Sequence, residues 1–349
     1  MSTPPDTIRA AVVGYGLAGS VFHAPLITAA EGMEVAAIVT SNPDRRAQAQ
    51  REHPGVTLYD TADDLWTDAA LYDLAVIATA NRAHAPLAVA ALTAGLPVVV
   101  DKPMAATLSD AEGTAGAAAA AGKLLTVFHN RRWDSDFLTA RKLIEEGAIG
   151  DPIRLESRFE RFRPAPREGA WRELPDPADA GGVLWDLGPH LIDQACVLFG
   201  DPTQLYAEVD VRRSGAQVDD DAFVALRFAG GQVAHLWMSA TAARPGPRLK
   251  VSGLAGAYQQ SELDVQEEAL REGRRDLVQP PGLLVEGESP PRELDPLPGA
   301  WERFYEGVRD ALLGNGDPPV DPADGLRAVA LVEAAHRSAA SREIVQLAP

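Results

Sequence analysis

The stretch Gly14-Tyr15-Gly16-Leu17-Ala18-Gly19 decides the fold, because it sets a complete G-x-G-x-x-G motif directly behind an apolar run. That run, residues 8–13, is typical of a strand buried on both faces of a parallel sheet, and helical spacing continues from the motif to about Ala30. A glycine-rich turn without a ligand is the alternative. The position at a strand-to-helix junction favours a dinucleotide-binding turn.

The residues of this motif have separate tasks in such a turn. Gly14 permits the tight bend, Gly16 lets the backbone approach a pyrophosphate, and Gly19 lets the helix pack closely on the strand. Leu17 and Ala18 stand at the start of the helix, where free N–H groups and a partial positive charge face the phosphates. We therefore assign these five residues to cofactor binding.

Apolar runs alternate with helical patterns throughout the first third of the chain. Further runs and the helical patterns between them occupy residues 35–39, 44–52, 63–68, 74–78, 84–94, 96–100, 109–121 and 124–128. Strands that alternate with helices imply right-handed βαβ units. Residues 1–127 are predicted to form a Rossmann domain with a doubly wound parallel sheet.

The pattern changes in residues 128–349, where runs of period two replace the buried strands. Such runs lie at 153–162, 204–212, 222–229, 232–240 and 247–253, and helical patterns at about 135–146, 188–199, 299–313 and 322–339. We expect an α+β domain with a large, mostly antiparallel open sheet, whose C-terminal helices can pack back on the first domain. The proline-rich residues 279–298 are expected to form a loop, either a plain connector or a lid.

The charge balance excludes several classes of partner. The 349 residues include 32 basic and 50 acidic side chains, a net charge of −18. Such a surface repels phosphate backbones and anionic headgroups, so we expect no nucleic-acid and no membrane partner. The single cysteine, Cys196, excludes an internal disulfide, and no cysteine cluster indicates a metal site. Without a signal-peptide pattern or a long apolar span, we expect a cytoplasmic protein.

The end of the second predicted strand bears on the choice of cofactor. An acidic residue at this position would bind the ribose 2′-hydroxyl of NAD, but Ser41 stands there, and Arg45 and Arg46 follow. A hydroxyl and a guanidinium suit a 2′-phosphate, so NADP(H) is favoured and NAD(H) stays the alternative. The other interpretation of both arginines is a solvent-facing position on the next helix.

Two further segments carry groups suited to proton transfer. Lys102, in Asp101-Lys102-Pro103, follows an apolar strand, at the sheet edge where ligands of open parallel sheets bind. Asp186 and His190 stand four apart in a segment that begins with Gly181-Gly182, a spacing that stacks side chains on one helical face. A histidine beside a carboxylate can accept an alcohol proton near neutral pH. A structural histidine at a helix start is the alternative, and a metal site would lack a third ligand.

Taken in order, these segments resemble the glucose–fructose oxidoreductase/inositol dehydrogenase (Gfo/Idh/MocA) family. The resemblance includes the glycine motif, Thr79-Ala80-Asn81-Arg82-Ala83-His84, Asp101-Lys102-Pro103 and the segment from Gly181 to His190. Phe22-His23-Ala24-Pro25-Leu26 and the segment from Phe128 to Asp134 are similar to the branch with NADP-dependent scyllo-inositol dehydrogenases. The resemblance implies hydride transfer at a sugar or cyclitol carbon, and a second domain used for substrate binding and oligomerisation.

The resemblance also implies roles for individual residues. Lys102 corresponds to the catalytic lysine, Asp186 to the acid and His190 to the proton-transfer histidine, and all three are expected to contact substrate. Further positions are assigned to the cofactor, namely Thr79, Asn81, His84, Asp101 and Lys102, and to the substrate, namely Asn130, Arg131 and Trp171. Asp101 and Ala80 depart from the family, which often has Glu and Pro there, but neither departure removes a reacting group.

The function expected from all these features is an NAD(P)-dependent oxidoreductase acting on a polyol or sugar, assembled as a homodimer or homotetramer. A non-catalytic sensor of the same fold and a redox-neutral NAD-dependent glycosidase are the alternatives. The first has no need of Lys102, Asp186 and His190, and the second does not fit a 2′-phosphate site. Outside the site, His23 is expected to pack on the first helix, and Asp219-Asp220-Asp221 to form a solvated hairpin end.

Overall fold

The computed structural model describes residues 7–167, 169–274 and 277–347. The chain forms two compact units, and it passes between them more than once. The first, here the Rossmann unit, comprises Met1–Asn130, Leu270–Arg275 and Trp301–Val329. The second, here the sheet unit, comprises Arg131–Ala269, Asp276–Ala300 and Ala330–Pro349.

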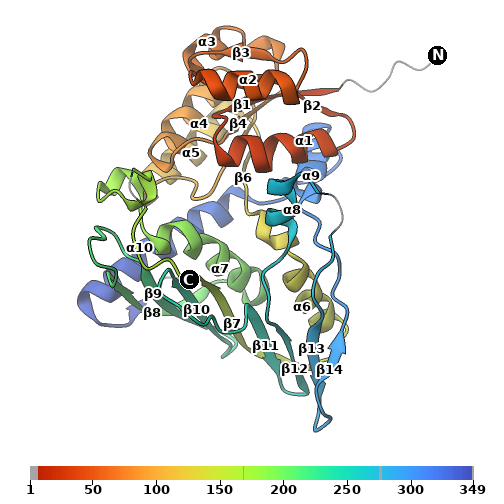
Figure 1. The fold of residues 1–349 in the computed structure, drawn as a ribbon, viewed down its shortest axis with the longest axis vertical. Helices are drawn as coiled ribbons and strands as arrows, with labels where there is room; N and C mark the ends of the chain where they lie inside the picture. Colours follow the sequence, from red (N-terminus) through yellow and green to blue (C-terminus); the bar gives the residue numbers. More distant parts are fainter. Residues whose placement is uncertain (1–6, 168, 275–276, 348–349) are drawn as a thin grey trace, which may run out of the picture. The chain divides into compact units, whose positions relative to one another are not determined.

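The Rossmann unit contains a six-stranded sheet of order β3-β2-β1-β4-β5-β6, and all its paired strands are parallel (Figure 1). Its strands are β1 Ile8–Val13, β2 Met33–Val39, β3 Thr57–Tyr59, β4 Leu74–Ile77, β5 Val98–Val100 and β6 Leu125–Val127. Its helices are α1 Ala24–Ala29, α2 Pro43–Glu52, α3 Ala62–Thr67, α4 His84–Thr93, α5 Leu108–Ala121 and α9 Glu302–Leu312. The predicted doubly wound sheet is confirmed, and only the short edge strand β3 was not predicted.

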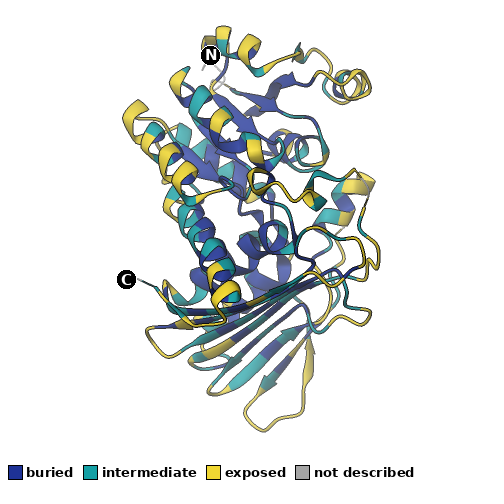
Figure 2. Cartoon of the chain, turned by 90° about the vertical axis from the view of Figure 1, so that its left-hand side faces the viewer, coloured by how far each residue is buried: buried dark blue, intermediate teal, exposed yellow. Residues whose placement is uncertain are grey.

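Burial follows the sequence pattern in this unit. Every residue of β4 and β5 is buried, and Figure 2 shows the parallel strands in dark blue.

Helix α5 illustrates how local sequence signals set the ends of a helix. Thr107 caps its start by accepting a hydrogen bond from the Asp110 N–H, and Gly122 ends it in the left-handed region at φ 61°.

The sheet unit contains nine strands in the order β14-β13-β12-β11-β7-β10-β9-β8-β15, and β7 and β10 form its one parallel pair among the described residues. Its strands are β7 Pro152–Glu160, β8 Pro202–Asp210, β9 Asp221–Phe228, β10 Val233–Ser239, β11 Leu249–Gly253, β12 Gly256–Gln260, β13 Gly282–Glu286, β14 Arg292–Leu294 and β15 Val345–Gln346. Helices α6 Ser135–Glu145 and α7 Val183–Phe199 lie along one face (Figure 1). The predicted large, mostly antiparallel sheet is confirmed. Two more helices, α8 Gln266–Glu272 and α10 Pro322–Ser341, have residues in both units.

Two predictions for this half of the chain were wrong, the start of one helix and a loop. Helix α7 begins at Val183, five residues before the predicted start, and Pro189 lies inside it. Residues 279–298 are no plain loop, because strands β13 and β14 form a hairpin there at the sheet edge. The prolines of this segment flank the two strands, positions that need no ladder hydrogen bond from their nitrogen.

Candidate functional site

The glycine motif forms a cradle whose three glycines meet different surroundings. Gly14 has φ +97°, and a Cβ there would lie 2.5 Å from the carbonyl oxygen of Ala78. A Cβ at Gly19 would lie 2.0 Å from the carbonyl oxygen of Gly14, so both positions exclude any larger residue. At Gly16 the nearest group to a Cβ is the Arg45 guanidinium, 3.7 Å away. The turn is therefore closely packed on the protein side and left open at Gly16, which fits the pyrophosphate of a dinucleotide.

The motif continues into a helix whose start carries Leu17 and Ala18. Residues Ala18–His23 form a π-helical turn that runs directly into α1, and the Ser20 N–H and hydroxyl both donate to the Gly16 carbonyl, at 2.9 and 2.8 Å. The expected helix after the motif is thus present, with a wider first turn. Leu17 is 42% exposed at this end, in keeping with a turn that faces a ligand.

The two arginines after β2 differ in what they contact. Arg46 donates to Asp60 at 2.7 Å and to the carbonyl of Thr40 at 3.2 Å. The side chain of Arg45 makes no hydrogen bond or ion pair with the part of the chain that the structure describes, and it lies beside Gly16. Ser41 is exposed at the same strand end. Of the two arginines, Arg45 is therefore the one available to a 2′-phosphate.

Lys102 follows β5 within a group of residues held by short contacts. Its N–H donates to Asp101 Oδ1 at 2.7 Å, and its bond to Pro103 is cis. The His84 ring joins the ends of two strands, because Nδ1 lies 2.7 Å from the Pro103 carbonyl oxygen and Nε2 3.2 Å from that of Thr79. The structure thus brings together four of the predicted residues, Thr79, His84, Asp101 and Lys102. Asn81 is buried in the short turn Asn81–Ala83 just before α4.

Two groups beside Lys102 have shifted pKa values. Burial alone would raise the pKa of Asp101, but His23 and then the charges of Lys102 and His84 lower it to about 2. Burial lowers the pKa of His84. Asp101 is therefore a carboxylate at neutral pH, and the His84 ring is held neutral.

Asp186 and His190 lie one turn apart near the start of α7, in the sheet unit. Asp186 Oδ1 accepts a hydrogen bond from Arg172 Nε at 3.0 Å. His190 is buried, and its ring packs edge-on against Phe159 with centroids 6.2 Å apart. The second acidic residue of α7, Asp193, binds Arg132 through both oxygens, at 2.6 and 2.8 Å. Because Lys102 belongs to the other unit, its convergence with Asp186 and His190 stays a prediction.

The three predicted substrate residues have different surroundings. Arg131 donates to Glu267 at 2.8 Å, and its guanidinium lies 4.7 Å from the centre of the Phe159 ring, so it is firmly held by protein groups. Asn130 is buried in the turn before α6. Trp171 is half-buried, with the guanidinium of Arg172 4.3 Å above its ring. Their roles toward a substrate stay predictions.

The acidic triplet Asp219-Asp220-Asp221 is not the solvated hairpin end that was expected. Asp220 is fully buried and Asp219 is 9% exposed. The expectation was wrong because it weighed only the turn pattern, while tertiary contacts with arginines and helix N–H groups satisfy the buried carboxylates. The sequence did hold one signal, the basic pair Arg212-Arg213 shortly before the triplet. His23 is fully buried at the end of the first helical turn, and its Nδ1 lies 2.7 Å from the Tyr305 hydroxyl.

Comparison with protein families covers both units. The family model for an oxidoreductase family with an NAD-binding Rossmann fold matches residues 8–129, and that for the GFO/IDH/MocA C-terminal domain matches residues 137–259. The chain belongs to the Gfo/Idh/MocA oxidoreductase family. The resemblance drawn from the sequence motifs is confirmed, and the protein is an oxidoreductase of the dehydrogenase or reductase type.

Relatives in the Gfo/Idh/MocA family match over almost the whole chain. The uncharacterized oxidoreductase YdgJ of Escherichia coli K12 is 40% identical, over 98% of this chain and 99% of its own. The Bacillus subtilis protein named scyllo-inositol 2-dehydrogenase (NADP(+)) IolW is 32% identical, over 98% and 96%. The solved structure of yvaA from Bacillus subtilis has a TM-score of 0.92 at 31% identity, covering 99% of this chain and 100% of that one.

The described residues also bear on two other kinds of site. No helix in residues 7–167, 169–274 and 277–347 is long and apolar enough to cross a membrane. Within the same ranges, no group of three or more His, Cys, Asp or Glu side chains is arranged to hold a metal ion.

Proposed function

We propose that this protein transfers a hydride between NADP(H) and a secondary hydroxyl, or the matching ketone, of a sugar or cyclitol. The observation that carries the cofactor assignment is the Arg45 guanidinium, which lies beside Gly16 without a protein partner among the described residues. No acidic residue stands at the end of β2 to bind a ribose 2′-hydroxyl. The similarity to IolW, whose name includes NADP(+) and scyllo-inositol, supports the same assignment.

Lys102, which follows strand β5, and Asp186 and His190, near the start of α7, suit proton transfer to and from an alcohol. The nicotinamide ring, when bound, supplies the hydride acceptor or donor. Lys102 polarises the substrate oxygen, and Lys102 and His190 are the two candidates for the base that accepts the hydroxyl proton. Asp186 orients the imidazole of His190 and stabilises its protonated form. Arg172, which donates to Asp186, fixes that carboxylate in turn.

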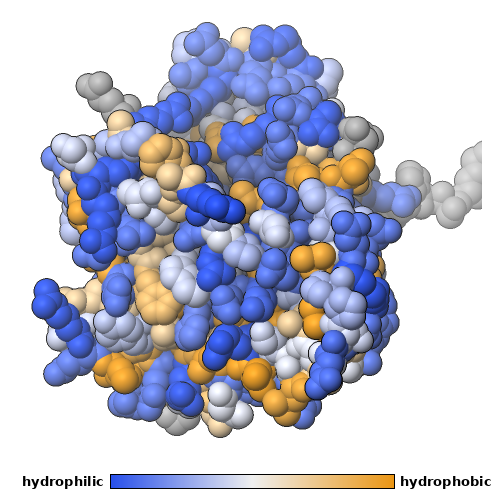
Figure 3. All heavy atoms as spheres, turned by 60° about the horizontal axis from the view of Figure 1, so that its bottom comes forward, coloured by the Kyte–Doolittle hydropathy of each residue, from blue (hydrophilic) through white to orange (hydrophobic). Residues whose placement is uncertain are grey.

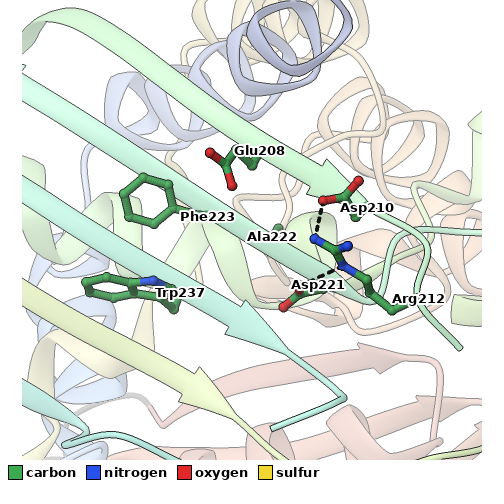
Figure 4. A pocket seen from close by; sticks show the side chains of 7 residues that line it. All are labelled: Glu208, Asp210, Arg212, Asp221, Ala222, Phe223 and Trp237. Carbon is green, nitrogen blue, oxygen red and sulfur yellow. Dashed lines mark hydrogen bonds and ion pairs between the residues drawn. The ribbon is translucent and has the colours of Figure 1, made fainter. Parts of the chain in front are cut away.

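The open face of the nine-stranded sheet supports a further proposal, a homodimer or homotetramer. Trp237 and Phe223 lie opposite each other on β10 and β9, with ring centroids 5.2 Å apart, and both are only half-buried (Figure 4). The Arg158 guanidinium lies 3.8 Å from the centre of the Trp237 ring. Apolar side chains also form patches among polar ones on the surface that Figure 3 turns toward the reader. Half-exposed aromatic rings of this kind mark a surface for a second copy.

The experiment that tests the proposed activity is a panel of cyclitols and aldoses, each assayed with NADP+ and NAD+. Absorbance of the reduced nicotinamide measures turnover. We expect turnover with at least one polyol and a higher kcat/KM for NADP+ than for NAD+. A clear preference for NAD+ would contradict the cofactor assignment and favour an NAD-dependent dehydrogenase.

A further inference from the structure

The start of helix α7 is capped by a residue from a distant loop. Asp219, which precedes β9, accepts the Leu184 N–H through Oδ2 at 2.8 Å and the Val183 N–H through its carbonyl oxygen at 3.0 Å. Val183 and Leu184 are the first two residues of α7, whose N–H groups have no partner inside the helix. Gly182, at the N-cap position, has no side chain for this task. Asp219 therefore does what an N-cap side chain does, from outside the helix.

Gly182 leaves the space that this cap occupies. Its φ is +94°, and a Cβ there would lie 2.0 Å from Asp219 Oδ1. Any other residue at this position would displace the carboxylate as well as strain the backbone. Gly182 and Asp219 together therefore form the cap of α7.

The neighbouring carboxylate holds the segment that contacts Asp186. Asp220, fully buried, accepts the N–H groups of Arg212 and Arg213 at 2.7 and 2.9 Å and the Arg213 Nε at 2.9 Å. The buried Arg213 guanidinium in turn donates to Glu173 at 2.9 Å and to the carbonyl of Ala165 at 3.2 Å. These contacts fix both ends of the segment that carries Arg172.

Arg172 connects this anchored segment to α7 at two points. Its Nε donates to Asp186 at 3.0 Å, and its carbonyl oxygen accepts the Gly182 N–H at 2.9 Å. Two adjacent acidic residues therefore act on one helix end. Asp219 fixes its backbone, and Asp220, through Arg213 and Glu173, fixes the cation that holds the Asp186 carboxylate.

We propose that Asp219 and Asp220 are positioning residues for Asp186 and His190, a role that rests on the proposed function of those two side chains. Asp219 sets the position of the first turn of α7, which carries Asp186 and leads into the turn of His190. Displacements of about 1 Å at a reacting group can cost on the order of 100-fold in rate. The loss of either carboxylate therefore changes catalysis beyond its effect on folding.

Asp321 offers a matched control for the cap. It also accepts an N–H of a helix start, that of Ala323 in α10 at 2.8 Å, and α10 carries no proposed site residue. The experiment compares Asp219→Ala, Asp219→Asn and Gly182→Ala with Asp321→Ala. For each we measure kcat and KM with a polyol substrate, the Kd of NADPH, and the ring ¹H–¹³C cross-peak of His190 in histidine-labelled protein.

We expect Asp219→Ala and Gly182→Ala to lower kcat at least tenfold and to move the His190 cross-peak, while the Kd of NADPH changes less than twofold. Asp219→Asn keeps an acceptor oxygen, so it should retain most of kcat and the native cross-peak. Asp321→Ala should lose thermal stability without any change in either readout. Should Asp219→Ala fail to fold, the Gly182→Ala and Asp219→Asn proteins decide the matter.

Two different failures can be told apart. If Asp219→Ala or Gly182→Ala leaves both kcat and the His190 cross-peak native, the positioning role is wrong, whatever the substrate. If the wild-type protein turns over no polyol, the proposed function fails, while the cross-peak comparison still decides whether Asp219 positions the His190 turn.

Discussion

The imidazole of His23 faces the carboxylate of Asp101, with Nε2 3.8 Å from Oδ2. On its other side the same ring meets the Tyr305 hydroxyl, 2.7 Å from Nδ1. Asp101 Oδ1 accepts the N–H of Lys102, so a row of three polar side chains lies behind the strand end that carries the proposed catalytic lysine. His23 is thus the side chain that the Asp101 carboxylate meets on the side away from Lys102.

This row predicts a specific pH dependence of stability for Asp101→Asn. The pKa of Asp101 is lowered from 3.8 to about 2 in the folded protein, so its stabilising contribution is present above about pH 4 and is lost as the pH falls toward 2. At 1.36 kcal/mol per pKa unit, the contribution at pH 7 is about 2 kcal/mol. Urea unfolding of both proteins from pH 7 to pH 2 measures it. The variant should be less stable at pH 7 and lose less stability between pH 4 and pH 2, and parallel curves would contradict the assignment.

Arg45→Ala should weaken the binding of NADP+ while leaving that of NAD+ nearly unchanged. A hydrogen bond to a charged group is worth roughly 1.5–3 kcal/mol, so Kd for NADP+ should rise about 10- to 150-fold. Arg46→Ala is the matched control, because its guanidinium binds Asp60 and the Thr40 carbonyl. Fluorescence titration with NADPH and NADH gives both constants. Equal losses for the two cofactors, or a larger effect of Arg46→Ala, would show that Arg45 does not hold the 2′-phosphate.

Trp237→Glu should disrupt the proposed oligomer. The substitution removes an aromatic ring from the half-exposed face of the sheet and places a carboxylate beside Phe223, and an interface would have to desolvate that carboxylate. Light scattering should change from a multiple of 37.1 kDa for the wild-type protein to the monomer mass. Leu71→Glu, at a 54% exposed position of the Rossmann unit, should leave the mass unchanged. A wild-type protein that is monomeric at micromolar concentration would contradict the proposal outright.

The sequence predicted the Rossmann unit well because its signals are local. Glycines and caps such as Thr107 and Gly122 lie next to the helices and strands that they delimit. The start of α7 was missed for the opposite reason, because its N–H groups are capped by Asp219, 35 residues further along the chain. The hairpin of β13 and β14 was missed because short edge strands flanked by prolines resemble a loop.

The candidate site, too, was predictable from the sequence only in part. The sequence identified the residue types and their order, and the structure shows that His84 does join Thr79 to Pro103 around Lys102. The basic pair Arg212-Arg213 before the acidic triplet offered opposite charges, but it could not show that Asp220 binds Arg213 in a buried contact, because that contact depends on tertiary packing. Positioning residues of this kind become visible only when the packing around the motif residues is known.

The last prediction concerns Lys102, Asp186 and His190. Lys102 follows a parallel strand, and Asp186 and His190 lie near the start of a helix. We propose that all three act on the same substrate oxygen. Lys102→Ala and His190→Ala should each lower kcat by about 10²- to 10⁴-fold, the usual contribution of a general acid or base, and His190→Ala should leave the Kd of NADPH nearly native. Asp186→Asn should also lower kcat, because an amide cannot stabilise the imidazolium. Since the groups act as a unit, the double variant of Lys102 and His190 should lose far less than the product of the single effects. Near-native turnover of both single variants on a verified substrate would refute the assignment. Strictly multiplicative losses would instead show that the two side chains contribute independently to the same transition state.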